Sequence, residues 1–366
     1  MKNLNDVVNI CIASDNNYAP LIATTIASVC FNTNRQVKFW CLESNINNFN
    51  KKLIDSMHDN FKNFEIQYIT IKRSLIDEFA SKVSTSGHIS PDTYSRLFIP
   101  SLFPTMEKML YIDIDLIAMG DIGTLYDTDL GNHLFGAIPE GNHAFLPQTL
   151  MADLQISPSH KYFNAGVLLM NPKKMFEANF LTDISNIANN YAGAIRYGDQ
   201  DLLNKYGDGA YLELPWRFNI LGVLLERAFN SDDATTRQKI HEEYNNIVIR
   251  HFESECKPWL TDTFWLNNAK IKNSMEFWTI AAMTPYLAWF ERQFKIKEPD
   301  TNEIFDGDLR VRLFGILPLI RIKNRAKKKT YLVFNCIPLI TCKLKNNNKK
   351  KVWRLFDCIT ILTQRY

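Results

Sequence analysis

The sequence contains no Cys-x-x-Cys pair, no signal-peptide core and no apolar run long enough to cross a bilayer. Its seven cysteines are an odd number without framework spacing, which predicts reduced thiols in a cytoplasmic compartment. The opening MKNLNDVVNI lacks the long apolar stretch of a signal peptide. The longest apolar candidate, Phe277 to Phe290, has 14 residues and contains Pro285, so it is too short for a transmembrane helix. The hydrophobic content of 46% is that of a globular protein.

The formal net charge of +3 conceals a strong asymmetry along the chain. From Leu309 onward there are 15 Lys and Arg and one acid, Asp357, which gives a net charge of +14. The first 308 residues hold the other 27 basic and 38 acidic residues, a net charge of −11. The two parts are therefore expected to meet different partners. The length of 366 residues suits one large α/β domain with an appendage, or two domains.

Short apolar runs alternate with helical stretches from the start of the chain. Val7 to Ser14, Val37 to Leu42 and Phe64 to Ile71 have the pattern of buried strands, and helices are expected through Ser28 and after Ser44, which can cap the second one. This alternation favours a parallel sheet covered on both faces, with a ligand at the carboxyl ends of its strands. Later segments predict a helix from Thr93 that ends at Pro100, and strands at Leu134 to Ile138, Tyr162 to Leu169 and Ile247 to Ile249.

The run Met109 to Asp115, MLYIDID, ends in two carboxylates one residue apart. If the strand continues through Asp115, then Asp113 and Asp115 lie on one face at its carboxyl end, where they suit a divalent cation held against a diphosphate. Three further Asp-x-Asp triplets, which begin at Asp127, Asp199 and Asp306, show that the spacing also arises by chance. The position at a strand end favours the metal site.

Three other polar segments have two interpretations each. The small residues of Asn164-Ala165-Gly166 permit close approach of backbone N–H groups to phosphate or sugar, or they form a simple bulge. Asp199-Gln200-Asp201 at a helix entrance are functional residues or ordinary caps. His251, six residues ahead of Lys257, supplies an imidazole to a metal, or it is a lone surface histidine.

These segments, in this order, resemble glycosyltransferase family 8, and in particular the bacterial galactosyl- and glucosyltransferases that build lipopolysaccharide and related surface glycans. The resemblance rests on ASDNNY, TYSRL, LYIDID, YFNAGVLL, DQDLLN and HFESECKPW and runs from about Val8 to Trp259. It implies an α/β fold of the GT-A type, with a Rossmann-like nucleotide-sugar-binding domain over residues 1–270. It also implies hexosyl transfer that retains the anomeric configuration.

The resemblance implies a metal site as well. Asp113, Asp115 and His251 match the metal ligands of the family, and two carboxylates with one imidazole fit Mn²⁺, with Mg²⁺ as the alternative. Lys257 matches the lysine that binds the diphosphate. Ser254 stands where the family usually has a glycine that approaches phosphate.

For the donor, the resemblance implies uridine contacts by one group of residues and sugar or diphosphate contacts by another. Gln200 would lie under the anomeric carbon, and because an amide is a poor nucleophile, same-face attack by the acceptor is favoured over a covalent intermediate. Glu140 stands where relatives often carry Asp, which bears on the choice of hexose. The matching residues are Ala13, Asp15, Asn17 and Tyr18 for uridine, Arg96, Asp113, Asn164, Ala165 and Gly166 for the rest of the donor, and Asp199 and Gln200 for catalysis.

Three similar segments occur in the basic tail: LFGILPLI from Leu313, VFNCIPLI from Val333 and LFDCITIL from Leu355. Basic runs from Arg321 to Lys329 and from Lys343 to Lys351 separate them. Apolar blocks alternating with Lys and Arg suit an interface lined with anionic lipid, so residues 309–366 are expected to associate with a membrane, after a helical connector over 271–308. Strands or helices packed on the enzyme are the alternative, and the absence of a binding motif makes nucleic acid a poorer partner.

The prediction is therefore a metal-dependent hexosyltransferase that uses a UDP-sugar and a saccharide acceptor, lipid-linked, and works in the cytoplasm on the inner face of the cell membrane. One alternative is a membrane-associated UDP-sugar-binding protein without turnover. Another is a sugar-phosphate nucleotidyltransferase, which the sequence SDNNYAP after the first strand disfavours because it is neither Gly-rich nor basic. Galactose and glucose are not distinguished by the sequence.

Overall fold

The computed structural model describes residues 7–82, 91–140, 149–222, 233–253, 257–260, 263–266, 269–272 and 275–293, and strands within residues 308–365. The chain divides into two compact units, Met1–Lys295 and Ile296–Tyr366, called the first and the second unit below. The phosphate contact predicted at Ser254 lies outside the described residues. The domain boundaries predicted at residues 270 and 308 stay predictions.

The elements of the first unit are mostly short. Its strands are β1 Val8–Ser14, β2 Val37–Glu43, β3 Phe64–Thr70, β4 Met109–Ile112, β5 Leu116–Ala118, β6 Phe135–Pro139, β7 Phe163–Met170, β8 Leu212–Glu213, β9 Ile249–His251, β10 Thr263–Leu266 and β11 Ala269–Lys272. Its α-helices are α1 Ala19–Asn32, α2 Asn48–Asp55, α3 Arg73–Lys82, α4 Ile99–Leu102, α5 Gly123–Tyr126, α6 Leu150–Asp153, α7 Pro172–Glu177, α8 Phe180–Asn190, α9 Asp199–Tyr206, α11 Ala234–Asn245, α12 Met275–Ala281 and α13 Leu287–Gln293. Its 3-10 helices are η1 Asn16–Tyr18, η2 Ser56–Asp59, η3 Pro91–Phe98 and η4 Trp216–Phe218.

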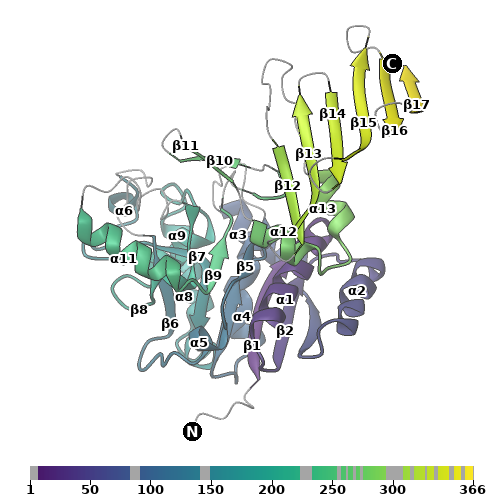
Figure 1. Cartoon of the computed structure of the whole chain (residues 1–366). Coiled ribbons are helices and arrows are strands. Elements are labelled where there is room, and N and C mark those ends of the chain that lie inside the picture. The colour runs from purple at the N-terminus through teal and green to yellow at the C-terminus, as the bar shows by residue number, and fades with distance from the viewer. Residues whose placement is uncertain are drawn as a thin grey trace. The chain divides into compact units, whose positions relative to one another are not determined.

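A mixed seven-stranded sheet forms the centre of the first unit, in the order β3-β2-β1-β4-β7-β6-β8 (Figure 1). Strands β1 to β4 are parallel, and Cys11 of β1 pairs with Tyr111 of β4. Strand β7 is antiparallel to both β4 and β6, so the predicted parallel sheet is wrong for this half. The alternation of strand and helix behind that prediction ends at β4, because the next element is another strand, β5.

Helices pack against both faces of this sheet, as the sequence predicts. Ile10 and Ile12 of β1 are buried in one apolar cluster with residues of α1, α12 and α13, whereas Cys11 is buried in a second cluster with residues of η3, α4, α7, α8 and α9. The alternation along β1 thus places successive residues on opposite faces. Cys11, Cys30 and Cys41 are buried free thiols, and the predicted reduced state of all seven cysteines stays a prediction.

Two predicted helix boundaries differ from the structure. Helix α2 begins after Asn47 rather than Ser44, because the Asn47 side chain accepts a hydrogen bond from the N–H of Asn50 at 2.8 Å. The segment from Thr93 is not one helix that ends at Pro100. It belongs to the 3-10 helix η3, and Pro100 then stands in the first turn of α4, where a missing N–H leaves no hydrogen bond unmade.

The second unit is an antiparallel meander whose strands follow one another in chain order. Each similar apolar segment of the sequence covers the end of one strand and the beginning of the next, and the basic runs lie at the opposite strand ends. Across the described part of the chain, no helix combines the length and apolar character that spanning a bilayer requires. The strands are β12 Asp308–Leu313, β13 Leu317–Arg325, β14 Lys328–Val333, β15 Ile337–Lys345, β16 Lys350–Leu355 and β17 Ile359–Arg365.

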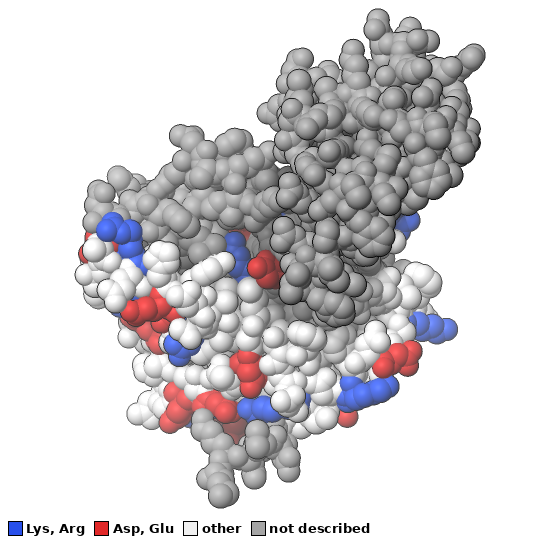
Figure 2. Space-filling view, in the orientation of Figure 1, with Lys and Arg blue, Asp and Glu red and all other residues white. Residues whose placement is uncertain are grey.

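Charge is distributed differently in the two units. On the face of the first unit shown in Figure 2, acidic and basic side chains are interspersed among the described residues. The stretch from residue 309 to the end carries 15 basic residues and one acid. Electrostatic attraction to a polyanionic partner is therefore concentrated in the second unit.

Candidate active site

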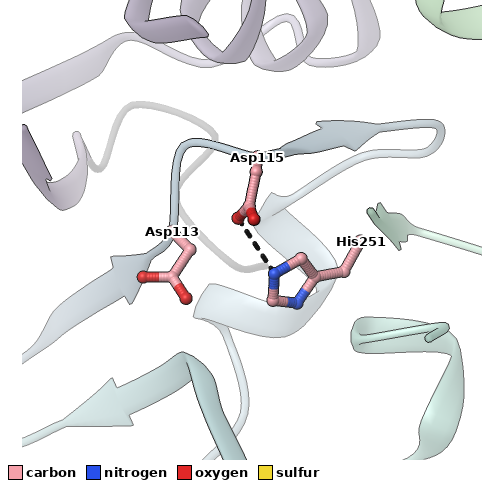
Figure 3. A group of neighbouring side chains, drawn as sticks. All are labelled: Asp113, Asp115 and His251. Atoms are coloured by element: carbon pink, nitrogen blue, oxygen red, sulfur yellow. Dashed lines mark hydrogen bonds and ion pairs between the residues drawn. The ribbon is translucent and has the colours of Figure 1, made fainter. Parts of the chain in front are cut away.

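The two predicted metal carboxylates lie in the turn between β4 and β5, beyond the carboxyl end of β4 (Figure 3). Strand β4 ends at Ile112, so the prediction that one strand runs through Asp115 is wrong. Alternation along a strand therefore does not bring Asp113 and Asp115 together. Instead, the turn carries both side chains toward the same space, where the side chains in Figure 3 face one another.

Strand β9 brings His251 to this turn from far along the sequence. Leu116 of β5 pairs with His251 of β9, and the N–H of Phe252 donates to the Asp115 carbonyl at 2.9 Å. His251 Nε2 lies 3.0 Å from Asp115 Oδ1. One potential ligand atom from each of Asp113, Asp115 and His251 lies within 4.8 Å of the other two. Asp115 and His251 are 136 positions apart in the sequence, and the two-stranded sheet of β5 and β9 brings them into one site.

Asn219 fixes the orientation of the His251 ring. The Asn219 Oδ1 atom is 3.0 Å from His251 Nδ1, and its Nδ2 donates to Asn164 Oδ1 at 2.9 Å. Because Asn219 Oδ1 is a hydrogen-bond acceptor, it favours a proton on Nδ1, and Nε2 is directed toward Asp115. Loss of the Nε2 proton would leave a lone pair there for a metal. Asn219 and His251 are both buried. No motif in the sequence marks Asn219, because its role arises only when η4 and β9 are adjacent.

Asp115 is held in its ionised form. Burial by itself would raise the pKa of Asp115, but the positive charges of Lys257 and His251 outweigh it and lower that pKa well below the usual range. The Lys257 ammonium forms an ion pair with Asp115 Oδ2. Burial alone would lower the pKa of His251, but the charge of Asp115 outweighs burial and raises that pKa. The site therefore presents a carboxylate, not a carboxylic acid, to any cation.

Arg96 links Asp113 to Asp199. Its Nη2 donates to Asp113 Oδ1 at 2.8 Å, and its Nε forms an ion pair of 2.8 Å with Asp199 Oδ2. Burial alone would lower the pKa of the guanidinium, but the charges of Asp113 and Asp199 outweigh burial and raise that pKa, so Arg96 stays charged. Tyr111 and Thr93, which were not predicted as site residues, donate at 2.8 Å to Asp113 and Asp199 respectively. Despite these donors, burial raises the pKa of Asp199 to about 6.

Gln200 is held by hydrogen bonds at both ends of its amide. Its Oε1 accepts from the N–H of Ala165 at 3.1 Å and from Asn164 Nδ2 at 3.2 Å. Its Nε2 donates to Glu140 Oε1 and to the Tyr162 hydroxyl, each at 3.3 Å. The predicted catalytic residue and the predicted hexose-selecting residue Glu140 are therefore in direct contact at the start of α9.

Gly166 occupies the point where the predicted metal ligands His251 and Asp113 approach β7. A Cβ at this position would lie 2.4 Å from His251 Cε1, 2.7 Å from Asp113 Oδ2 and 2.8 Å from Asn164 Oδ1. The Gly166 N–H already donates to Asn164 Oδ1 at 2.9 Å, and its carbonyl accepts from the N–H of Asp113 at 2.8 Å. Glycine here serves the close approach of other side chains, while the donor contact predicted for its backbone stays a prediction.

The predicted uridine residues lie at the carboxyl end of β1, next to the carboxyl end of β4. Asp15 caps η1, and its Oδ1 accepts from the N–H of Asn17 at 2.8 Å and of Tyr18 at 3.3 Å. The Tyr18 side chain is exposed. Ala13 is the penultimate residue of β1. The structure thus places this group and the metal ligands at one edge of the sheet, where open α/β sheets bind ligands.

Comparison with known families decides the class of the protein. The sequence model described as "Glycosyl transferase family 8" matches residues 9–263, which covers every predicted site residue. The chain belongs to glycosyl transferase family 8. The resemblance predicted from the six motifs is thereby confirmed.

Several proteins with known names or structures are similar to this chain over most of the first unit. A protein of Haemophilus influenzae is 30% identical over 257 residues, which are 69% of this chain and 73% of that protein. The lipopolysaccharide 1,2-glucosyltransferase of Escherichia coli is 24% identical over 269 residues, 70% of this chain and 74% of that enzyme. The crystal structure of the galactosyltransferase LgtC with donor and acceptor sugar analogs matches with a TM-score of 0.62 and 26% identity, over 76% of this chain and 96% of LgtC. This likeness confirms the α/β fold of the GT-A type.

Proposed function

We propose that this member of glycosyl transferase family 8 transfers galactose or glucose from a UDP-sugar to a saccharide acceptor, with retention of anomeric configuration, in the assembly of bacterial lipopolysaccharide or another surface glycan. The observation that carries the proposal is the convergence of Asp113, Asp115 and His251 at the sheet edge. The likeness to a lipopolysaccharide glucosyltransferase and to LgtC supports the envelope glycan.

The residues at this edge fit a divalent cation. Two carboxylates and one imidazole, completed by diphosphate oxygens, suit Mn²⁺, with Mg²⁺ as the alternative. Asp115 is ionised, His251 has its Nδ1 engaged by Asn219, and Gly166 leaves the space between the ligands free of a side chain. When bound, such a cation would act as a Lewis acid that neutralises charge on the UDP leaving group.

One cationic side chain would bind the diphosphate, and a second would hold the carboxylates beside it. Lys257, which pairs with Asp115, stands beside the ligands and would exchange part of that contact for a phosphate oxygen. Arg96 is buried and already paired with Asp113 and Asp199, so its part is to fix these two carboxylates.

At the other end of the donor, the exposed ring of Tyr18 would lie against uracil, on a turn that the Asp15 cap holds in place.

The sugar end of the donor would lie against Gln200. Because its amide is a weak nucleophile and both ends are hydrogen-bonded, we favour same-face attack by the acceptor, with Gln200 and Asp199 stabilising and orienting the oxocarbenium-like sugar. Glu140, 3.3 Å from Gln200 Nε2, would contact the hexose hydroxyls and so influence the choice between galactose and glucose. Replacing Gln200 with Ala is expected to reduce transfer by about 100-fold. A nearly full rate would disprove this role.

The second unit would hold the enzyme at the anionic inner face of the cell membrane. The last 58 residues of the chain contain 15 basic residues and one acidic residue, and most of the basic ones lie in the strands of this unit. Each Lys or Arg near an anionic surface contributes about 1 kcal/mol of attraction. Such a position would bring the first unit to a lipid-linked acceptor. The attachment should weaken as salt concentration rises, because ions screen the charges.

The test is the release of UDP from a panel of UDP-sugars by the purified protein, with and without candidate acceptors. Release from one UDP-hexose, with the hexose recovered on a saccharide in the original anomeric form, is expected and would name the donor. Tight binding of a UDP-sugar without release in any condition would instead indicate a binding protein that has lost turnover. Formation of a UDP-sugar from a sugar phosphate would indicate a nucleotidyltransferase.

A further inference from the structure

The strand pairing of the second unit separates its residues into two chemically different faces. One row of paired residues crosses all six strands and is wholly apolar: Leu309, Ile322, Tyr331, Ile340, Leu355 and Ile359. Since residues paired across antiparallel strands lie on the same face, this row belongs to one face. The row on one side of it is also apolar, with Val311, Ile320, Val333 and Ile337. The row on its other side is mixed and joins Asn324, Lys329, Cys342, Trp353 and Leu362. We call this side of the sheet the apolar face.

The other face is basic. One of its rows joins Arg325, Lys328 and Lys343, and the next joins Lys345, Lys350 and Arg365. These residues alternate in sequence with those of the apolar face. Two basic residues are exceptions, because the same register places Lys329 and Lys351 on the apolar face, toward the strand ends that carry the basic runs. Their long side chains can extend past the rim of that face. The other basic residues of the paired strands lie on the opposite side of the sheet.

An irregularity in each repeat maintains this separation. The register shifts once in each of the hairpins β12–β13, β14–β15 and β16–β17, between Val311 and Arg312, between Tyr331 and Leu332, and between Trp353 and Arg354. Each shift leaves one extra residue on the partner strand, which restores the alternation beyond it. The irregularities recur at equivalent places of three repeats, so they are a regular feature of this sheet.

We propose that the apolar face is covered by the same face of a second copy of this chain, so that two second units pack as a β-sandwich with their basic faces outside. Antiparallel sheets bury one apolar face against another layer about 10 Å away. A face of six strands about 4.8 Å apart, each six to nine residues long, measures roughly 29 by 20 Å. Two such faces would bury on the order of 1,200 Å², which reaches the size of stable interfaces. This inference is independent of the proposed reaction.

Charge and hydrogen bonding favour this occupant over lipid. Face-to-face packing keeps the two basic faces on the outside, separated by more than the roughly 10 Å between sheets. Because the Debye length at physiological salt is about 8 Å, repulsion between the two basic faces would be largely screened. Insertion of the apolar face into hydrocarbon would take with it the edge strands β12 and β17, whose free N–H and C=O groups cost several kcal/mol each in lipid. The outer basic faces remain suited to the anionic membrane surface.

The experiment is sedimentation velocity of the full-length protein over a range of concentrations, for the native chain and two matched variants. Ile340→Glu places a charge at the centre of the apolar face, in the row with Tyr331 and Leu355. Thr341→Glu is the control, because the next residue lies on the basic face, paired with Thr330 and Arg354. The native chain and Thr341→Glu should sediment at about twice the 42.4 kDa monomer mass at micromolar concentration. Ile340→Glu should sediment as the monomer.

A milder variant guards against unfolding. Ile340→Thr keeps a β-branched side chain and removes apolar surface twice per dimer, so it should raise the dimer dissociation constant by about 10-fold or more with unchanged circular dichroism. A native chain that stays monomeric at about 100 μM would overturn the proposal, as would equal dissociation of both glutamate variants. Loss of binding to phosphatidylglycerol vesicles by Ile340→Glu, with a monomeric native chain, would assign the face to lipid instead. UDP release by the same samples reports separately on the first unit.

Discussion

Gly166→Ala is the substitution for which the structure gives the sharpest expectation. The new methyl group would lie 2.4 Å from His251 Cε1 and 2.7 Å from Asp113 Oδ2, whereas non-bonded carbon atoms prefer about 3.5 to 4.0 Å. The backbone at Gly166 is not in the left-handed region, so the cost is steric rather than conformational. Relief requires the His251 ring to move by about 1 Å away from its place between Asn219 and Asp115.

Such a displacement should affect the site more than the fold. Overpacking of this kind costs about 1 to 3 kcal/mol of the free energy of unfolding. A misplacement of about 1 Å in a catalytic group costs about 100-fold in rate, and here it involves His251, a proposed metal ligand. We therefore expect kcat/KM for the UDP-hexose to fall by about 100-fold and the affinity for Mn²⁺ to fall with it.

The assay combines UDP release with a Mn²⁺ titration followed by electron paramagnetic resonance. Gly193→Ala is the matched control, because a Cβ at Gly193 meets no atom within 4 Å. The control should keep native activity and native Mn²⁺ affinity. If Gly166→Ala binds Mn²⁺ as tightly as the native protein and releases UDP at the native rate, the site geometry argued above is wrong.

Substitutions at three further positions test separate parts of the site. Because burial raises the pKa of Asp199 to about 6, folding favours its neutral form, and the free energy of unfolding should fall by up to about 3 kcal/mol as pH rises from 4 to 6. Urea unfolding should show no such fall in Asp199→Asn, and an identical fall in that variant would refute the assignment. Asn219→Ala should weaken Mn²⁺ binding by about 10- to 100-fold and Asn219→Asp should restore it, since either acceptor can hold His251 Nδ1; equal loss in both variants would indicate a merely structural part. Lys257→Met should raise KM for the UDP-hexose by about 10-fold or more, and an unchanged KM would remove Lys257 from the diphosphate site.

Local patterns in the sequence predict much of the first unit. The apolar runs at β1, β2, β3, β6 and β7 are strands within a few residues of the predicted bounds, and Asp199 does open a helix. These elements are encoded by short-range hydrophobic patterning, which one sequence displays directly. Strand direction is not encoded in this way, and the antiparallel course of β7 is therefore visible only in the fold.

The site is predicted less completely, for the same reason. The motifs identify Asp113, Asp115 and His251, yet the alternation argument for the two carboxylates is wrong because β4 ends before them. What joins them to His251 is the β5–β9 pair, a contact between distant segments. Asn219 has no sequence signal because its role depends on that contact.

In the second unit, the composition of the blocks is plain from the sequence, but their sorting is not. The blocks predict contact with anionic lipid but do not show on which face of a sheet each residue lies. The strand register places Ile340 and Thr341 on opposite faces. A single shift of register exchanges the two faces of a strand, so block composition alone is insufficient. The register shifts of the three hairpins supply the missing information.

The most direct test of the metal-dependent site is UDP release from the preferred UDP-hexose in the native protein and in Asp115→Asn, each first with a chelator and then with Mn²⁺ restored. Asp115→Asn removes one carboxylate from the group that faces His251 and Lys257. The account predicts that the native protein loses release with the chelator and regains it with Mn²⁺, whereas Asp115→Asn stays inactive in both conditions. Full release by the native protein in the presence of chelator, or native activity of Asp115→Asn, would contradict it.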